Sequence, residues 1–275
     1  YLRDFRFTGD IWAVPEGTPI FPREPIVTVR APAIQAQLLE TYMLLEFNHQ
    51  SLIATKANRV CRAAEGRAVL EFGSRRAQGI AGAVTGARAA YIGGCAGTAC
   101  TVSDQLYGVP AAGTMAHSWV QMFPSEYEAF VAYCKAYPDN AVLLVDTYNT
   151  LKSGVPNAIR AFNEVLKPLG IKKCGIRLDS GDMAYLTQRA RAMLDEAGWT
   201  DCTITVSNSL DERLISELLR QGAKIDSFGV GERLITSRSS PVFGGVYKLC
   251  AVEDGKGNII PKIKVSENVG KITNP

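Results

Sequence analysis

The sequence is poor in histidine, with only His49 and His117 among its 275 residues. It has no apolar run long enough to cross a bilayer, and its start lacks the basic, apolar and small-residue order of a secretion leader. We therefore expect a cytoplasmic protein without a membrane partner.

Long runs of basic residues are also missing. Lysine and arginine are dispersed and the net charge is only +3, so no nucleic-acid partner is predicted, although local basic clusters suit phosphates. A hydrophobic content of 47% and a charged content of 21% are ordinary for a globular protein with a sizeable core. The length suits one α/β barrel or two smaller domains.

CxxC pairs are absent, and the seven cysteines are scattered and odd in number. They are Cys61, Cys95, Cys100, Cys134, Cys174, Cys202 and Cys250. Several occur in apolar, strand-like contexts. This pattern predicts small buried thiols in a reducing compartment and gives little support to zinc or disulfide sites.

Local patterns divide the chain into four stretches. Residues 1–32 are rich in proline, glycine and β-formers, which predicts a partial β-rich domain. Residues 33–67 predict a helical connection, because 35–62 lacks glycine and proline and has apolar residues at helical spacing. Residues 68–244 predict an α/β barrel, and 245–275 a hairpin that returns to the small domain. Both ends interrupt structured-looking sequence, so we expect a fragment of a longer protein.

Within residues 68–244, short apolar runs alternate with helical segments of the length that returns a chain to a parallel strand. The expected strands are 68–72, 89–92, 111–115, 141–146, 175–178, 203–207 and 227–230. The expected helices are 77–85, 99–106, 126–136, 155–166, 183–197 and 211–221. This long series favours a closed or nearly closed barrel over an open sheet.

Arginines, carboxylates, hydroxyls and glycines recur at the carboxyl ends of these expected strands. In α/β folds those ends face the ligand site, so the recurrence favours one shared site over loops that merely face solvent. The residues with this placement are Phe72, Arg75, Arg76, His117, Asp146, Arg177, Asp179, Asp182, Ser209, Gly229 and Gly231.

The residue types point to phosphate and sugar chemistry. The Gly-Val-Gly motif at 229–231 lets backbone N–H groups approach a phosphate closely. Arg75 and Arg76 suit a carboxylate or phosphate, and Asp179 and Asp182 suit ribose hydroxyls or Mg²⁺. Simpler alternatives are an ordinary glycine turn, a solvated arginine pair, and an Asp182 that caps the following helix.

Two ring-bearing side chains add to this candidate site. Phe72 is suited to stacking on a flat ring, and equally to the core. His117 follows an apolar run that predicts a strand, so it is a candidate covalent or acid/base group; the alternative is a histidine that donates to a backbone carbonyl. His49 lies inside the long predicted helix, where a structural role is more typical.

Five motifs in chain order closely resemble those of the nicotinate phosphoribosyltransferases. They are 71–79 (EFGSRRAQG), 113–118 (GTMAHS), 177–182 (RLDSGD), 207–212 (SNSLDE) and 228–231 (FGVG), followed by 244–249 (GGVYKL). The resemblance covers essentially the whole chain. It implies the irregular parallel α/β barrel of the type II phosphoribosyltransferases, with a partial second β-rich domain formed by the chain ends.

The resemblance implies transfer of a phosphoribosyl group from phosphoribosyl pyrophosphate to the ring nitrogen of nicotinate, which yields nicotinate mononucleotide and pyrophosphate in NAD salvage. It implies coupling to ATP hydrolysis through a phosphohistidine at His117. A phosphoryl group there would place negative charge beside Mg²⁺ and pyrophosphate and help to drive synthesis. Family members are expected to be homodimers in which the other subunit completes the active site.

The resemblance also implies roles for individual residues. The expected catalytic residues are His117, Arg177 and Asp179. The expected substrate-binding residues are Phe72 and Arg75 at the pyridine ring, their neighbour Arg76, and Ser209, Gly229 and Gly231 at the 5′-phosphate. The candidate metal ligands are Asp146 and Asp179.

Two relatives and one non-catalytic function are the alternatives. Nicotinamide phosphoribosyltransferase has a matching histidine, but an aspartate after its second strand helps to select the amide. This sequence has Ile92-Gly93-Gly94-Cys95 in that region, without a carboxylate to repel an acid. Quinolinate phosphoribosyltransferase shares the architecture but lacks the motif set. We expect the family's amino-terminal part, which supplies an aromatic residue across a dimer interface, to be missing from this sequence, so a non-catalytic nucleotide-binding barrel is also an alternative.

Overall fold

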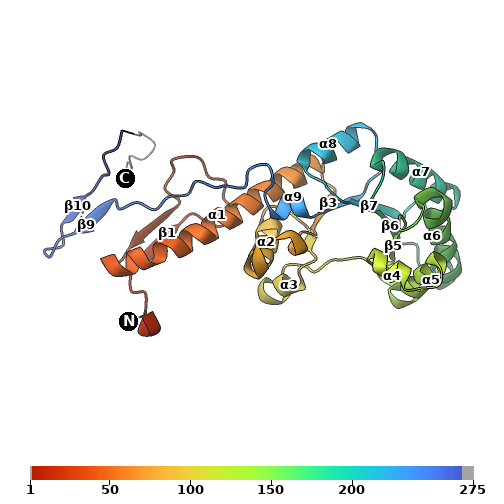
Figure 1. Cartoon of the computed structure of the whole chain (residues 1–275), viewed down its shortest axis with the longest axis horizontal. Helices are drawn as coiled ribbons and strands as arrows, with labels where there is room; N and C mark the ends of the chain where they lie inside the picture. The colour runs from red at the N-terminus through yellow and green to blue at the C-terminus, as the bar shows by residue number, and fades with distance from the viewer. Residues whose placement is uncertain (1, 268–275) are drawn as a thin grey trace. The chain divides into compact units, whose positions relative to one another are not determined.

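The protein is described by a computed structural model, in which residues 2–267 are described. The chain divides into two compact units (Figure 1). Unit 1 combines residues from both ends of the chain, within 1–48 and 242–275, and unit 2 comprises residues 49–241.

Unit 1 contains two short antiparallel strand pairs and the first part of a long helix. Its strands are β1 (Asp10–Ala13), paired with β2 (Val27–Arg30), and β9 (Ala251–Glu253), paired with β10 (Ile259–Pro261). Arg30 forms an ion pair with Glu253 at 2.7 Å, and the Tyr247 hydroxyl donates to the Ala36 carbonyl. The carboxyl-terminal hairpin therefore packs against the amino-terminal segment.

Helix α1 (Ala33–Ala63) is one continuous helix, as the absence of glycine and proline predicts. Its buried residues, Ile53, Lys56, Ala57 and Val60, recur at helical spacing in the part that belongs to unit 2. Among residues 2–267 no helix, α1 included, has the length and apolar character that a membrane span requires.

The core of unit 2 is a parallel sheet with the strand order β4-β3-β8-β7-β6-β5. The strands are β3 (Ala68–Glu71), β4 (Gly97–Thr98), β5 (Val142–Leu144), β6 (Gly175–Leu178), β7 (Thr203–Ser207) and β8 (Ser227–Val230). Most of their residues are buried, as is typical of parallel strands covered on both faces, and Val69, Leu143, Ile176, Ile204 and Phe228 are at most 1% exposed. The predicted α/β class is confirmed. In the described residues, strand pairing runs from β4 to β5 without joining these two edges.

Helices connect these strands, and Figure 1 shows α5 to α8 on the outer side of the sheet. The helices are α2 (Gly79–Ile92), α3 (Thr101–Tyr107), α4 (His117–Gln121), α5 (Glu126–Ala136), α6 (Val155–Ala161), α7 (Met183–Glu196), α8 (Glu212–Arg220) and α9 (Glu232–Ile235). Ser125, Asp182 and Asp211 cap α5, α7 and α8 with their side chains. The capping alternative for Asp182 is therefore confirmed.

Two predicted strands are wrong. Residues 89–92 form the end of α2, because the alanine-rich run from Gly79 continues as helix, and the strand follows later as β4. Residues 111–115 make only a single bridge, between Ala111 and Thr98, before the chain leaves the sheet. His117 is consequently the first residue of α4 rather than a strand end.

The predicted helix 155–166 is also more irregular than expected. Residues Thr150–Gly154 and Phe162–Leu166 form π-helical turns, η4 and η5, on either side of α6. Gly154 explains how η4 approaches the sheet so closely, since a Cβ built on Gly154 would lie 1.7 Å from the carbonyl oxygen of Val145. Only glycine fits there.

Gly154→Ala should therefore destabilise unit 2. We expect the free energy of unfolding, measured by urea titration, to fall by about 2–3 kcal/mol, because overpacking forces η4 away from β5. Gly113→Ala is the control, since an added Cβ there meets nothing within 4 Å. It should change stability by less than about 0.5 kcal/mol. Equal effects of the two substitutions would contradict the packing argument.

Candidate active site

Arg177 is the residue around which polar side chains of unit 2 gather. It lies on β6, and its guanidinium carries three hydrogen bonds of 2.8 Å each, from Nε to Ser207 Oγ, from Nη1 to Thr114 Oγ1, and from Nη2 to Asp179 Oδ1. The planar fork of an arginine presents its donors in fixed directions. Arg177 thus holds β6, β7 and the loop before α4 in one arrangement.

His117 lies between two polar groups. Its Nδ1 is 3.0 Å from Thr147 Oγ1, and its Nε2 is 3.8 Å from Asp179 Oδ2. A carboxylate on the Nε2 side favours a proton on that nitrogen, so we assign Nδ1 as the acceptor of the threonine hydroxyl. The imidazole side chain is 41% exposed, which leaves it open to an incoming group.

Asp146 follows β5 and contacts the segment after β6. Its Oδ2 accepts from the backbone N–H of Asp179 at 2.8 Å and from the Ser180 hydroxyl at 2.6 Å. Its Oδ1 is buried and has no hydrogen-bond partner among the described residues. The structure thus brings together the two predicted metal ligands, Asp146 and Asp179. A carboxylate oxygen without a donor is suited to a hard cation, which prefers oxygen ligands.

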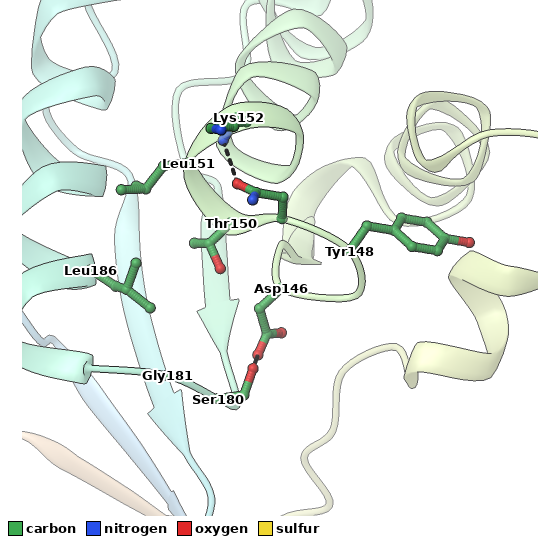
Figure 2. A pocket seen from close by; sticks show the side chains of 9 residues that line it. Asp146, Tyr148, Thr150, Leu151, Lys152, Ser180, Gly181 and Leu186 are labelled. Carbon is green, nitrogen blue, oxygen red and sulfur yellow. Dashed lines mark hydrogen bonds between the residues drawn. The ribbon is translucent and has the colours of Figure 1, made fainter.

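A cavity of about 420 Å³ opens beside Asp146, between the segments that follow β5 and β6 (Figure 2). Its lining residues are Asp146, Tyr148, Asn149, Thr150, Leu151, Lys152, Ser180, Gly181 and Leu186. Figure 2 shows the side chains of Asp146 and Ser180 meeting at its edge. The mixture of carboxylate, hydroxyl, amide and ammonium groups suits a polar ligand.

Phe72 follows β3 and lies over the backbone of β8. A Cβ built on Gly229 would lie 2.5 Å from a carbon of the Phe72 ring, so the ring can occupy this position only because residue 229 has no side chain. The ring centroid is 5.5 Å from the guanidinium carbon of Arg177. Phe72 therefore belongs to the Arg177 cluster, and its ring is half-buried rather than part of the apolar core.

The loop after β7 has an unusual backbone. Asn208 and Ser209 are consecutive non-glycine residues in the left-handed region, with φ of 84° and 54°. The phosphate contact near Ser209 stays a prediction. Gly231 lies at the start of α9, after the neighbouring strand β8.

Ion pairs behind this loop hold its conformation. Asp211 caps α8 and also accepts from Arg233 at 2.6 Å. The buried Lys56 of α1 forms an ion pair with Glu212 at 2.6 Å and donates to Ser239. A strained backbone persists where its surroundings over-determine it, and these charged contacts have that effect here.

Arg75 and Arg76 do not join the Arg177 cluster. They form the 3-10 turn η2 (Ser74–Arg76), and both are exposed. Neither guanidinium makes an ion pair with any residue in the described part of the chain. They are therefore available to an anion from outside.

Glu71 is a buried carboxylate that ends β3 immediately before this turn. One oxygen accepts from the Gly73 N–H and the other from the Thr98 hydroxyl. Burial raises the pKa of Glu71 above its ordinary value, while the hydrogen bonds from Thr98 and Gly73 lower it in part.

Several polar contacts were not predicted as site residues. They are Glu71, Thr98, Thr114, Thr147, Ser180 and Ser207. All of them except Thr98 lie within two residues of an expected strand end or in motifs that carry a predicted residue, so a search for polar side chains beside each predicted residue would have found them. Thr98 ends β4, a strand that was not predicted. Their partners, however, come from distant segments, and the sequence does not show those pairings.

Comparisons with known proteins show which family this chain resembles. The model of the nicotinate phosphoribosyltransferase (NAPRTase) family matches residues 68–253, and that of the NAPRTase N-terminal domain matches 1–48. The second match corrects the expectation that the family's amino-terminal part is missing, because residues 1–48 belong to it. Nicotinate phosphoribosyltransferase of Bacillus subtilis is 48% identical over 266 residues, which cover 96% of this chain and 53% of that protein. The Dictyostelium discoideum enzyme is 38% identical over 312 residues, which cover 96% and 52%. The chain spans about half the length of the curated relatives it matches.

Solved structures support the fold. Human nicotinic acid phosphoribosyltransferase has a TM-score of 0.71 and 33% identity, covering 80% of this chain and 55% of that chain. Nicotinate-nucleotide pyrophosphorylase from Pyrococcus furiosus has a TM-score of 0.72 and 27% identity, covering 97% and 72%. These likenesses confirm the predicted type II phosphoribosyltransferase architecture.

Glu71 makes the stability of the fold depend on pH. The pKa of its carboxyl is raised above 4.5 on folding, so its neutral form is favoured in the folded state. Stability is therefore full below pH 4.5 and falls as the pH rises through the folded pKa. Glu71→Gln cannot ionise and should lack this decline. In urea unfolding at a series of pH values, the free energy of unfolding of Glu71→Gln should rise relative to that of the wild type as the pH approaches neutral. A difference between the two proteins that does not change with pH would contradict this.

Proposed function

The chain belongs to the nicotinate phosphoribosyltransferase family, and we propose that it transfers a phosphoribosyl group from phosphoribosyl pyrophosphate to the ring nitrogen of nicotinate. The products are nicotinate mononucleotide and pyrophosphate, in NAD salvage. The observation that carries the proposal is the cluster of His117, Arg177 and Asp179, which two separate segments, the start of α4 and the end of β6, bring together.

The proposed reaction depends on positioning rather than on a strong base. The ring nitrogen of a pyridine already has a free lone pair, so no residue needs to remove a proton from it. The site must stabilise positive charge on the ribose ring and negative charge on the departing pyrophosphate. Asp179 is suited to the ribose side and Arg177 to the phosphate side. Phe72 and Arg75 receive the pyridine, with Arg76 beside them.

His117 is the proposed acceptor of a phosphoryl group from ATP. A nitrogen lone pair attacks the γ-phosphorus, ADP leaves, and the imidazole becomes an anionic phosphohistidine. Our tautomer assignment leaves that lone pair on Nδ1, where Thr147 now donates. Asp179, beside Nε2, stabilises the positive charge that the ring develops during attack.

Mg²⁺ is the proposed metal, and the residues present fit it. Asp146 Oδ1 is a buried oxygen without a hydrogen-bond donor, and Asp179 is adjacent. Mg²⁺ is commonly bound by one or two carboxylates together with substrate phosphates, and Asp146 and Asp179 are the carboxylates proposed here. When bound, the ion neutralises charge on the pyrophosphate. We also propose a cytoplasmic homodimer in which the partner completes the site.

Pyrophosphate release tests the activity directly. Full-length protein is given phosphoribosyl pyrophosphate and nicotinate, with and without ATP. We expect release with nicotinate, a higher yield with ATP, and an acid-labile phosphate from γ-labelled ATP. His117→Ala should lose the label and the ATP effect because the accepting nitrogen is gone, while Ser118→Ala, a control at the next residue, should keep both. Nucleotide binding without pyrophosphate release would instead favour a non-catalytic barrel.

Substrate choice is the second point to test, because nicotinamide is the alternative substrate. The structure moves the relevant strand end to Thr98, the last residue of β4, and the following Ala99-Cys100-Thr101 again lacks a carboxylate. This absence supports an anionic acid as the substrate. Ala99 is exposed, so a larger side chain fits without disturbing the core.

Ala99→Asp should discriminate against nicotinate. An added negative charge repels the substrate carboxylate, so we expect the KM for nicotinate to rise about tenfold or more. Ala99→Asn has the same shape without the charge and should change this KM by less than about threefold. Steady-state kinetics with nicotinate and nicotinamide measure both. Equal KM values for the Asp and Asn variants would refute the electrostatic account.

A further inference from the structure

Glu71 has no role in the proposed chemistry, yet it occupies an unusual environment. Its side chain is wholly buried, and no lysine, arginine or histidine among the described residues forms an ion pair with it. A buried carboxylate without a cation is costly. The strand pattern does not require it, because Val69 on the same face of β3 is a buried apolar residue. An apolar side chain at 71 would continue that face.

The first oxygen of Glu71 shapes the turn after β3. It accepts from the N–H of Gly73, two residues ahead, where the backbone leaves the extended conformation and η2 begins. Gly73 is also confined by Ile235, since an added Cβ would lie 2.6 Å from Ile235 and 2.7 Å from Glu71 Oε1. The carboxylate and Ile235 therefore define the path of the chain between Phe72 and Arg75.

The second oxygen ties this turn to the neighbouring strand end. The Thr98 hydroxyl donates to it at 2.7 Å and accepts from the N–H of Cys100, which precedes α3, at 2.9 Å. The backbone of Glu71 also accepts from Ala99 at 2.9 Å. One side chain thus fixes the turn at 72–76 relative to the start of α3.

We propose that Glu71 is a positioning residue that presents Phe72 and Arg75 to the pyridine carboxylate of the substrate. The proposal rests on the proposed function of the site. Glu71 acts through the turn and does not touch the substrate. Its hydrogen bonds do not reach Arg177 or Ser209, which belong to the phosphoribosyl side. Loss of Glu71 should therefore weaken recognition of nicotinate more than recognition of phosphoribosyl pyrophosphate, because the turn reaches the phosphoribosyl side only through the contact of Phe72 with Arg177.

Three variants separate the contributions of the two oxygens. Glu71→Leu keeps most of the volume and removes both acceptors. Glu71→Gln keeps an acceptor for Gly73 and places an amide against the Thr98 hydroxyl, so it is the conservative rescue. Thr98→Val keeps nearly the same shape and leaves the Gly73 bond intact, but it removes the second bond to Glu71 together with the acceptor for the Cys100 N–H. These are measured in the full-length enzyme by KM for each substrate, kcat and thermal unfolding.

Thr187→Val is the matched control for a buried hydrogen bond elsewhere. The Thr187 hydroxyl is fully buried, donates to Met183 and accepts from the N–H of Lys224. This variant should lower the unfolding temperature without changing either KM. It shows how a loss of stability alone affects the kinetics.

We expect Glu71→Leu to raise the KM for nicotinate about tenfold or more, while the KM for phosphoribosyl pyrophosphate stays within about twofold. Glu71→Gln should stay within about threefold of the wild type in both, and Thr98→Val should follow Glu71→Leu with a smaller change. Unchanged nicotinate KM in Glu71→Leu, or equal increases in both KM values, would overturn the proposal. If Glu71→Leu does not fold, an unchanged nicotinate KM in Thr98→Val overturns it.

Failure of the proposed function is recognised separately, in the wild type. A wild-type protein that releases no pyrophosphate with nicotinate and phosphoribosyl pyrophosphate refutes the activity. In that case the affinity for nicotinate, measured by calorimetric titration, tests the positioning role of Glu71. Weaker binding to Glu71→Leu and Thr98→Val than to Glu71→Gln supports that role, and equal binding overturns it.

Discussion

Three hydrogen bonds from one guanidinium hold the candidate site together. Arg177 on β6 bonds Ser207 on β7, Thr114 in the loop before α4, and Asp179 just after its own strand. Asp179 in turn faces His117. A polar group left unpaired at a partly buried site costs about 1–3 kcal/mol, so these groups depend on one another for their positions. The site is therefore organised before a substrate arrives.

Apolar strands provide the rigid support for this polar cluster. Ile176, Ile204 and Phe228 in the centres of β6, β7 and β8 are fully buried, while polar side chains follow at the carboxyl ends. Close packing resists small displacements, and catalysis by positioning requires such resistance. Glu71 and Lys56 extend the same principle, because each holds a turn near the site through a buried charged or ionisable group.

The sequence predicted the middle of unit 2 better than its beginning. β6, β7 and β8 match the expected strands at both ends, since short apolar runs between turn residues have few other conformations. The run at 89–92 was predicted as a strand, but an alanine-rich sequence fits a buried helix equally well. The run at 111–115 was also predicted as a strand, but an apolar segment need not pair with a neighbouring strand. His117, Asp146, Arg177 and Asp179 do lie together, whereas Arg75 and Arg76 stay exposed apart from them.

By itself the sequence determined the α/β class, the family and the residue types at the strand ends, because periodicity and motif order are local properties of the chain. Only the tertiary structure decided which groups meet. The contact of His117 with Thr147 and that of Glu71 with Thr98 join segments that are far apart in the chain. The unpaired oxygen of Asp146 depends on burial, which the sequence does not show. Hydrogen bonding and desolvation act between neighbours in space, and sequence order alone does not define those neighbours.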